Sequence, residues 1–166
     1  MTTIAKANYP ARTASQGVPG KDFIAFVNYG ENATALAPKW NMLGGTNNDN
    51  LGLSAEVSTQ QTKESGYWQE GAVSGKSGEY SAEMVVLRNN LAQQVIEEFL
   101  YDDEITSEKG ALHMALVDKV SKDYTEFWAI PTSWELAAES GDLATYNLTA
   151  TIVGTPEKKA GFVIPS

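Results

Sequence analysis

The sequence contains one helical pattern, and its other periodic segments alternate as strands do. This combination restricts the possible fold classes more than any other feature of the sequence. The segment RNNLAQQVIEEFLYDDE places Leu91, Val95 and Phe99 on one stripe with polar residues opposite, and an asparagine before Leu91 can cap the first turn. We therefore predict one α-helix over residues 90–104. Because a single helix cannot cover both faces of many strands, the predicted fold of residues 1–166 is one mainly β (α+β) domain, an antiparallel β-sandwich or barrel with a flanking helix.

The strand patterns differ in how clearly they alternate. LGLSAEVSTQQ places Leu51, Leu53, Ala55 and Val57 on one face and polar residues on the other, which predicts a half-buried strand of an antiparallel sheet. The segment before it, residues 44–50, is rich in Asn and Gly and is expected to be a polar loop. Further strands are expected at residues 22–30, 40–44, 67–73, 79–87, 111–120, 124–137 and 143–154, with turns on both sides of 67–73.

Both ends of the chain are expected to be extended arms. Residues 1–21 carry Lys6 and Arg12, no acid and no sustained periodicity. Residues 154–166 form the expected C-terminal arm, which is basic at Lys158 and Lys159. A segment that gains little by folding alone can become ordered against a neighbouring subunit.

The charge balance bears on possible partners. The chain has 12 basic and 21 acidic residues and a formal charge of −9, so it is poorly suited to grip nucleic acid, whose phosphates must be neutralised. It has no cysteine, which excludes disulfides and thiolate chemistry. No apolar run is long enough to span a bilayer, and the N-terminus lacks the apolar core of a signal peptide, so we expect no membrane insertion.

The search for reactive groups gives no catalytic, cofactor-binding or metal site. His113, the single histidine, lies in an alternating strand opposite Leu112 and Met114, which predicts an exposed or interface histidine. The acids at residues 102–104 do not match the spacing of a calcium loop, and a solvated charged turn is the competing interpretation to cation binding there. The sequence contains no nucleophile elbow, P-loop or dinucleotide fingerprint, so we predict that the protein is not an enzyme.

The aromatic residues leave one alternative function open. Trp68, beside Tyr67 in a turn-rich segment, is the best candidate for an exposed sugar-binding surface. A carbohydrate-binding β-sandwich is therefore an alternative hypothesis from another functional class.

The order of elements resembles that of the major tail tube proteins of long-tailed, non-contractile bacteriophages. The likeness is carried by the strand EYSAEMVVL, the helix LAQQVIEEFLYDDE, and a closing pattern of an acidic turn AAESGD, the Thr-rich strand LATYNLTATIVG and a basic tail. It is clearest between about residues 75 and 159. The resemblance implies a β-sandwich with one flanking helix, shared with the tubes of contractile tails and of type VI secretion.

The resemblance also implies a function. Six copies would form a ring, rings would stack into the phage tail tube, and inner strands of all subunits would join into one barrel that conducts the genome. The implied partners are the tape-measure protein, the tail terminator, the distal tail proteins and double-stranded DNA in transit. The implied location is the virion tail, after assembly in the host cytoplasm. A tube of a related secretion or injection machine is the nearest alternative.

Candidate residues follow from combining this implication with the charge pattern. A lumen of carboxylates and small hydroxyls would repel DNA phosphates, and the polar strand faces have that composition. The lumen candidates are Glu56, Ser58, Glu79 and Glu83. The inter-subunit candidates are Lys6, Arg12, Thr46, Asn47, Asp102, Asp103, Glu104, Lys158 and Lys159. The segment 44–50 is expected to contact the next ring.

Overall fold

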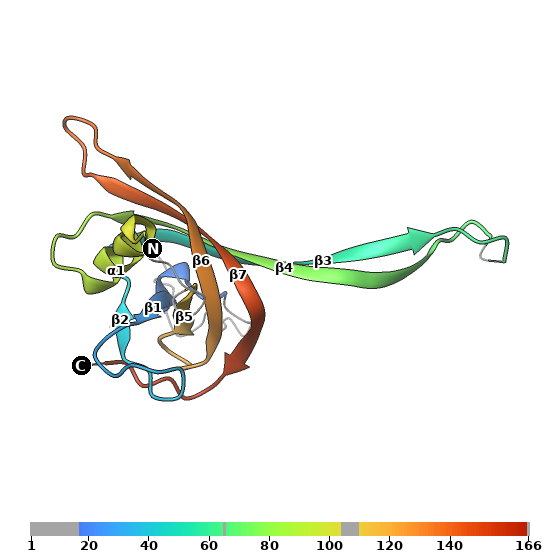
Figure 1. The fold of residues 1–166 in the computed structure, drawn as a ribbon, viewed down its shortest axis with the longest axis horizontal. Coiled ribbons are helices and arrows are strands. Elements are labelled where there is room, and N and C mark those ends of the chain that lie inside the picture. Colours follow the sequence, from blue (N-terminus) through green and yellow to red (C-terminus); the bar gives the residue numbers. More distant parts are fainter. Residues whose placement is uncertain (1–16, 65, 104–109, 166) are drawn as a thin grey trace, which may run out of the picture.

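A single curled sheet organises the molecule (Figure 1). The computed structural model describes residues 17–64, 66–103 and 110–165. Within them, seven strands pair antiparallel in the order β2-β1-β5-β6-β7-β4-β3. The strands are β1 (Phe23–Asn28), β2 (Trp40–Met42), β3 (Thr46–Gln60), β4 (Glu70–Val85), β5 (Leu112–Asp118), β6 (Tyr124–Ala137) and β7 (Thr145–Lys159). The predicted mainly β, antiparallel fold with one flanking helix is confirmed.

The helix α1 (Leu91–Tyr101) begins where its sequence provides a cap. The Asn90 side chain accepts a hydrogen bond from the backbone of Gln93 at 3.1 Å, and its amide donates to the carbonyl of Met42 at 3.1 Å. At the other end, Asp102 has extended backbone angles, so the helix stops at Tyr101 rather than at the predicted Glu104. Glu104 itself lies outside the described residues.

The main core fills the space between α1 and the concave side of the sheet. From α1, Ala92, Val95 and Ile96 are buried against residues of β1, β4, β5, β6 and β7. Gln93 is buried among them, and it bonds the carbonyls of Gly44 and Val85 and the backbone N–H of Leu87 at 2.9–3.0 Å. This side chain ties the helix to the strand ends on either side of it.

A second, smaller core covers the opposite side of β1 and β5. It joins Phe26, Ala115 and Val117 to Phe162 near the C-terminus, which is only 5% exposed. The predicted C-terminal arm from residue 154 is therefore corrected in two respects. Residues up to Lys159 belong to β7 and pair with β6, and Phe162 packs on the chain's own sheet. Phe162 packs there because burying its aromatic ring is favourable for the free energy of folding.

Two sequence predictions about β3 and β4 were wrong. Thr46 to Asn50 belong to β3 instead of a polar loop, because their backbone pairs with β4 while every polar side chain is satisfied. The three asparagines are exposed, and the half-buried Thr46 and Asp49 hydrogen-bond the carbonyl of Leu43 and the hydroxyl of Tyr80. Likewise, the glycines and serines of residues 74–78, expected to form a turn, lie within the continuous strand β4. A register shift between Glu56 and Val57 accommodates Ser74 as an extra residue. The result is one long hairpin that projects beyond the body (Figure 1).

The start of the described chain is exposed. Residues 17–22 end in a short 3-10 helix, Gly20–Asp22, none of whose residues is buried. The rest of the predicted N-terminal arm, with Lys6 and Arg12, lies outside the described residues.

Candidate assembly surfaces

The side of the sheet that faces away from α1, here called the outer face, gathers the predicted lumen residues. On β4, Tyr80, Ala82 and Met84 are buried in the main core, so the alternating Glu79 and Glu83 point the other way. The pairing of β3 with β4 then sets which β3 residues share that side. All four candidates are exposed and share the outer face: Glu56, Ser58, Glu79 and Glu83.

Across its central strands, the outer face is polar and carries no positive charge. On β7, the cross-strand partners of Glu79, Ser81 and Glu83 are Thr151, Thr149 and Asn147, respectively. On the other side of β7, Thr149 pairs with Ser133 of β6, and Asn147 pairs with Glu135. Ser54 and Ser77 are joined by a 2.8 Å hydrogen bond between hydroxyls. Over β3, β4, residues 130–137 of β6 and residues 145–153 of β7, the register places no lysine or arginine on this face.

Open strand edges include the outer side of β3 and one side of the end of β6. β3 pairs only with β4, and β6 pairs with β5 only as far as Ala129, the partner of Leu112. Residues 130–137 of β6 therefore have one free side, and so does the whole of β3. The four strands β6, β7, β4 and β3 form a sheet segment with unpaired backbone donors and acceptors along both borders, which is a template for further pairing.

The β3–β4 hairpin also has an apolar face, opposite its polar outer face, and this apolar face is exposed. Leu53, Val57 and Val73 are 61%, 57% and 59% exposed and lie on the side that, nearer the body, forms the main core. The strand Leu51–Val57 therefore alternates as predicted, but beyond Leu51 it is not half-buried within its own chain. Lys76, opposite Ala55, lies on this same side, and it is the only basic residue of β3 and β4.

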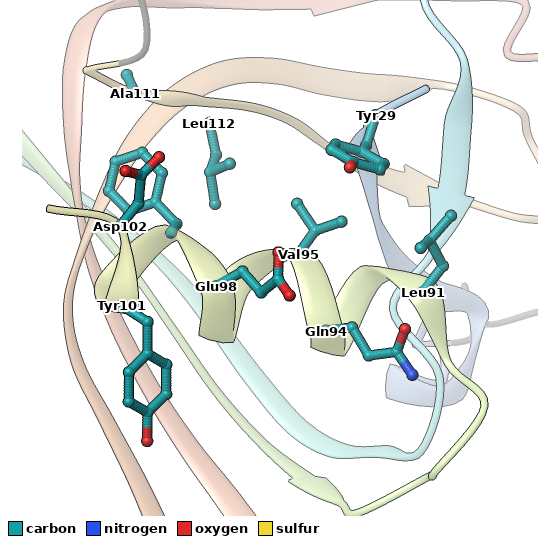
Figure 2. A pocket seen from close by; sticks show the side chains of 10 residues that line it. Tyr29, Leu91, Gln94, Val95, Glu98, Tyr101, Asp102, Ala111 and Leu112 are labelled. Atoms are coloured by element: carbon teal, nitrogen blue, oxygen red, sulfur yellow. The ribbon is translucent and has the colours of Figure 1, made fainter. Parts of the chain in front are cut away.

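A groove runs along α1 beside the start of β5 (Figure 2). Its helix wall includes Val95, Glu98 and Tyr101, and its other wall includes Tyr29 and Leu112. Leu112 pairs with Ala129, so the groove lies near the point where β6 loses its β5 partner. The last turn of α1 has no basic residue, and Glu98 is exposed there. Of the acids at this end of the helix, Glu98, Asp102 and Asp103 are exposed, beside a groove that polar and apolar side chains line together.

His113 is buried instead of exposed, which corrects its sequence-based placement. It is 4% exposed, stacked on Trp128 with ring centroids 4.5 Å apart and near Trp40 at 4.9 Å. Its strand phase was predicted correctly, because it does point away from Met114. His113 is enclosed because the second core covers this side of β5, where Ala115 and Val117 are also buried.

Around His113 the charged groups are paired within the chain. Its Nε2 bonds the carboxylate of Glu126, which also forms an ion pair with Lys159. Burial lowers the pKa of His113, and this outweighs the opposing attraction of Glu126. Burial raises the pKa of Glu126, but hydrogen bonds from Lys159 and His113 bring it below its ordinary value. The hydrogen bond to Glu126 raises the pKa of Lys159.

The other candidates are dispersed. Thr46 and Asn47 begin β3, Asp102 caps α1, Asp103 follows it, and Lys158 is exposed on β7. Lys159 already pairs with Glu126 and Glu157, so its predicted contact with another subunit would compete with these. Tyr67 and Trp68 are 100% and 84% exposed at the tip of the β3–β4 hairpin. Among the described residues, no group of three or more His, Asp or Glu side chains is placed to hold a metal ion.

Sequence reasoning missed the most informative features of the surface. Neither the free side of β6 nor the exposed apolar side of the hairpin was expected. The alternation of residues 51–57 was the available signal, because it showed an apolar face without showing what covers it. No helix in the described part of the chain is long and apolar enough to cross a bilayer.

Comparison with solved structures shows the same fold in tubes. A chain in the tail of an empty gene transfer agent particle, refined with C6 symmetry, has 17% identity and a TM-score of 0.70, covering 87% of this chain and 100% of that one. The SPP1 tail tube gives 12% identity, a TM-score of 0.70 and coverages of 89% and 81%. The sheath-tube complex of an extracellular contractile injection system, PVC, gives 13% identity, a TM-score of 0.57 and coverages of 96% and 100%.

Sequence comparison gives the family. No curated protein shows significant similarity to the chain. The family model described as phage tail tube protein, however, matches residues 17–158. This range contains the helix and all seven strands except Lys159, the last residue of β7. The chain thus belongs to the phage tail tube protein family.

Proposed function

We propose that this protein is the structural subunit of a phage tail tube, in which six copies close into a ring and rings stack into the conduit for the genome. The observation that carries the proposal is the four-stranded segment β6-β7-β4-β3, which has open edges on both borders and one mainly polar face without lysine or arginine. The C6 symmetry of the gene transfer agent tail supports the number six.

Strand direction favours closure of such a ring. Each neighbouring pair in the segment is antiparallel, so β6 and β3 run in opposite directions. Rotation about a tube axis leaves strand direction along that axis unchanged. When the β3 edge of one copy meets the free side of β6 in the next, the new pair is therefore antiparallel like all the others. Ring closure would then remove both exposed edges at once.

The polar outer face is suited to line the lumen of this ring. Glu56, Glu79 and Glu83 would repel DNA phosphates, and the intervening Ser and Thr hydroxyls give the passing polymer no strong contact. In this proposal, the tape-measure protein occupies the lumen during assembly, and double-stranded DNA passes through it at ejection.

The remaining assignments extend the same proposal. The tail terminator and the distal tail proteins would contact the two ends of the tube. The residues proposed for contacts between subunits are Lys6, Arg12, Thr46, Asn47, Asp102, Asp103, Glu104, Lys158 and Lys159. Assembly would take place in the host cytoplasm, and the mature location would be the virion tail. The likeness to PVC keeps a tube of an injection machine as the second candidate.

Electron microscopy of concentrated protein tests the proposal. We expect rings or tubes with a central hole. A particle that stays monomeric at all concentrations, also with tape-measure protein and tail terminator present, would refute the ring.

Engineered disulfides test how the ring closes. Because the chain has no natural cysteine, only the introduced thiols can form a cross-link. Ser133→Cys on the free side of β6, combined in turn with Ser54→Cys or Ser58→Cys on β3, should cross-link neighbouring copies in assembled protein for at least one pair. Ser133→Cys with Ser121→Cys, in the exposed turn before β6, is the matched control and should give no cross-link between copies.

A further inference from the structure

The β3–β4 hairpin needs a partner on one side only. We propose that its apolar side packs on the C-terminal turn of α1 in the next copy, with Lys76 facing the acidic residues of that turn. This inference rests on the proposed ring and specifies a contact between its subunits.

The hairpin by itself lacks a covering layer. A two-stranded ribbon is marginally stable in water unless one face is packed, and Leu53, Val57 and Val73 are more than half exposed. Its opposite face carries Ser54, Glu56 and Ser77 and is suited to solvent. An apolar face at the end of such a projection is typical of a protein interface.

The location of the partner follows from the continuity of a sheet. If β3 of one copy extends the sheet of the next at β6, residues on the core side of β3 lie beside residues on the core side of that β6. The core side of β6 there carries Trp134 and Leu136, and Leu136 is 60% exposed. Helix α1 packs on β6 on this same side. Its last turn presents Leu100 and Tyr101, which are 41% and 77% exposed.

Apolar groups are therefore left uncovered on both sides of the proposed junction. On one copy they belong to the hairpin, and on the next they belong to the end of α1 and to the free side of β6. The groove along α1 (Figure 2) opens at the same place, between the helix and the start of β5. Packing the hairpin there would bury both sets, which is the main source of association free energy.

Charge favours the same pairing. The last turn of α1 has no basic residue, and the helix dipole adds negative potential where Glu98 is exposed and Asp103 follows. Lys76 is the only basic residue on β3 or β4, it lies on the apolar side, and no salt bridge involves it among the described residues. A lysine placed at a helix C-terminus among carboxylates is stabilising, so the hairpin supplies the charge that the helix lacks.

A disulfide experiment locates the contact. Val57→Cys with Leu100→Cys in the full chain should give covalent links between copies in assembled tubes under oxidising conditions, because both side chains are exposed in the single subunit. The control is Ser58→Cys with Leu100→Cys, because Ser58 is the next residue on β3 and points to the outer face. Equal cross-linking of both pairs, or none of the Val57 pair in tubes that form normally, would overturn the proposal.

A charge exchange gives an independent test. Lys76→Glu should raise the protein concentration required for assembly by about tenfold, because an attractive pair becomes repulsive. Adding Glu98→Lys to the same chain should restore most of the loss. If wild-type protein forms tubes and the Lys76→Glu variant assembles equally well, this contact is disproved and the proposed ring is not. If wild-type protein forms no rings, the ring itself is disproved.

Discussion

Asn28 and His113, on the adjacent strands β1 and β5, are joined by a 3.0 Å hydrogen bond whose direction fixes the protonation of the histidine. The Asn28 carbonyl oxygen accepts from the backbone of Lys39 at 2.8 Å, and its amide nitrogen donates to the carbonyl of Thr34 at 3.0 Å. The group that faces His113 is therefore the amide N–H, so His113 Nδ1 accepts and Nε2 carries the proton shared with Glu126. A proton on Nδ1 would set two donors against each other.

Acidification from pH 7.5 to pH 5 should therefore destabilise the subunit. The pKa of His113 is lowered from 6.5 by burial, so as pH falls through 6.5 the unfolded chain takes up the proton before the folded one does. Stability is full above pH 6.5 and declines below it until the pH passes the folded pKa. Urea unfolding at several pH values measures this.

The assignment to one residue can be checked directly, since the chain has a single histidine. Its ring proton resonance should titrate with a midpoint below 6.5, and a midpoint above 6.5 would contradict the arrangement. His113→Gln should remove the slope between pH 7.5 and 5. It should keep the loss of stability below pH 4.5, where Glu126, whose pKa is lowered, takes up a proton.

Gln93→Ala should destabilise the fold by about 2–4 kcal/mol, because it leaves buried backbone groups at Gly44, Val85 and Leu87 without partners. Gln94→Ala is the matched control on the next residue. Gln94 is exposed, and its side chain donates to the carbonyl of Arg88, so the loss of stability in this variant should stay within about 0.5 kcal/mol. Similar unfolding midpoints for both variants in urea would refute this role of Gln93.

Phe162→Ala should lower the unfolding free energy by about 3 kcal/mol. The ring packs against Phe26, Tyr124 and Trp40 at centroid distances of 4.8, 5.1 and 5.8 Å, and its backbone N–H donates to the carbonyl of Lys122 at 2.9 Å. Val163→Ala, at a position that is 82% exposed, should change stability by less than about 0.5 kcal/mol. If both variants unfold at the wild-type midpoint, the C-terminal segment behaves as the free arm expected from the sequence.

Reversing charge on the proposed lumen should slow DNA delivery without blocking assembly. Glu56→Lys with Glu83→Lys adds phosphate-binding groups on the outer face, whereas Glu31→Lys changes an exposed residue in the connection between β1 and β2. We expect several-fold slower ejection for the double variant and wild-type speed for the control, measured by dye uptake of released DNA. Equal rates in both would mean that Glu56 and Glu83 do not line the path.

Local patterns predicted much of the fold. The stripe of Leu91, Val95 and Phe99 with an asparagine cap gave the helix, and β6 was predicted at its observed limits, because these signals depend on neighbours in the sequence. Residues 44–50 and 74–78 were wrongly predicted as a loop and a turn. Asn, Gly and Ser favour turns, but they also occur in strands when their backbone pairs with a neighbouring strand, as it does between β3 and β4. The candidate lumen residues share one face as the alternation indicated, although their place in a tube is still a prediction.

By itself, the sequence determined the β-rich class with one helix, the acidic character and the alternation of Glu79 to Glu83, since these are properties of composition and of period. Only the tertiary structure decided that Phe162 covers the sheet and that His113 is enclosed by aromatic rings. It alone also decided that β6 keeps a free side beyond Ala129 and that the apolar side of the hairpin is uncovered. These depend on which strands become neighbours and how far each pairing extends, and contacts between residues distant in the chain leave no periodic trace in it.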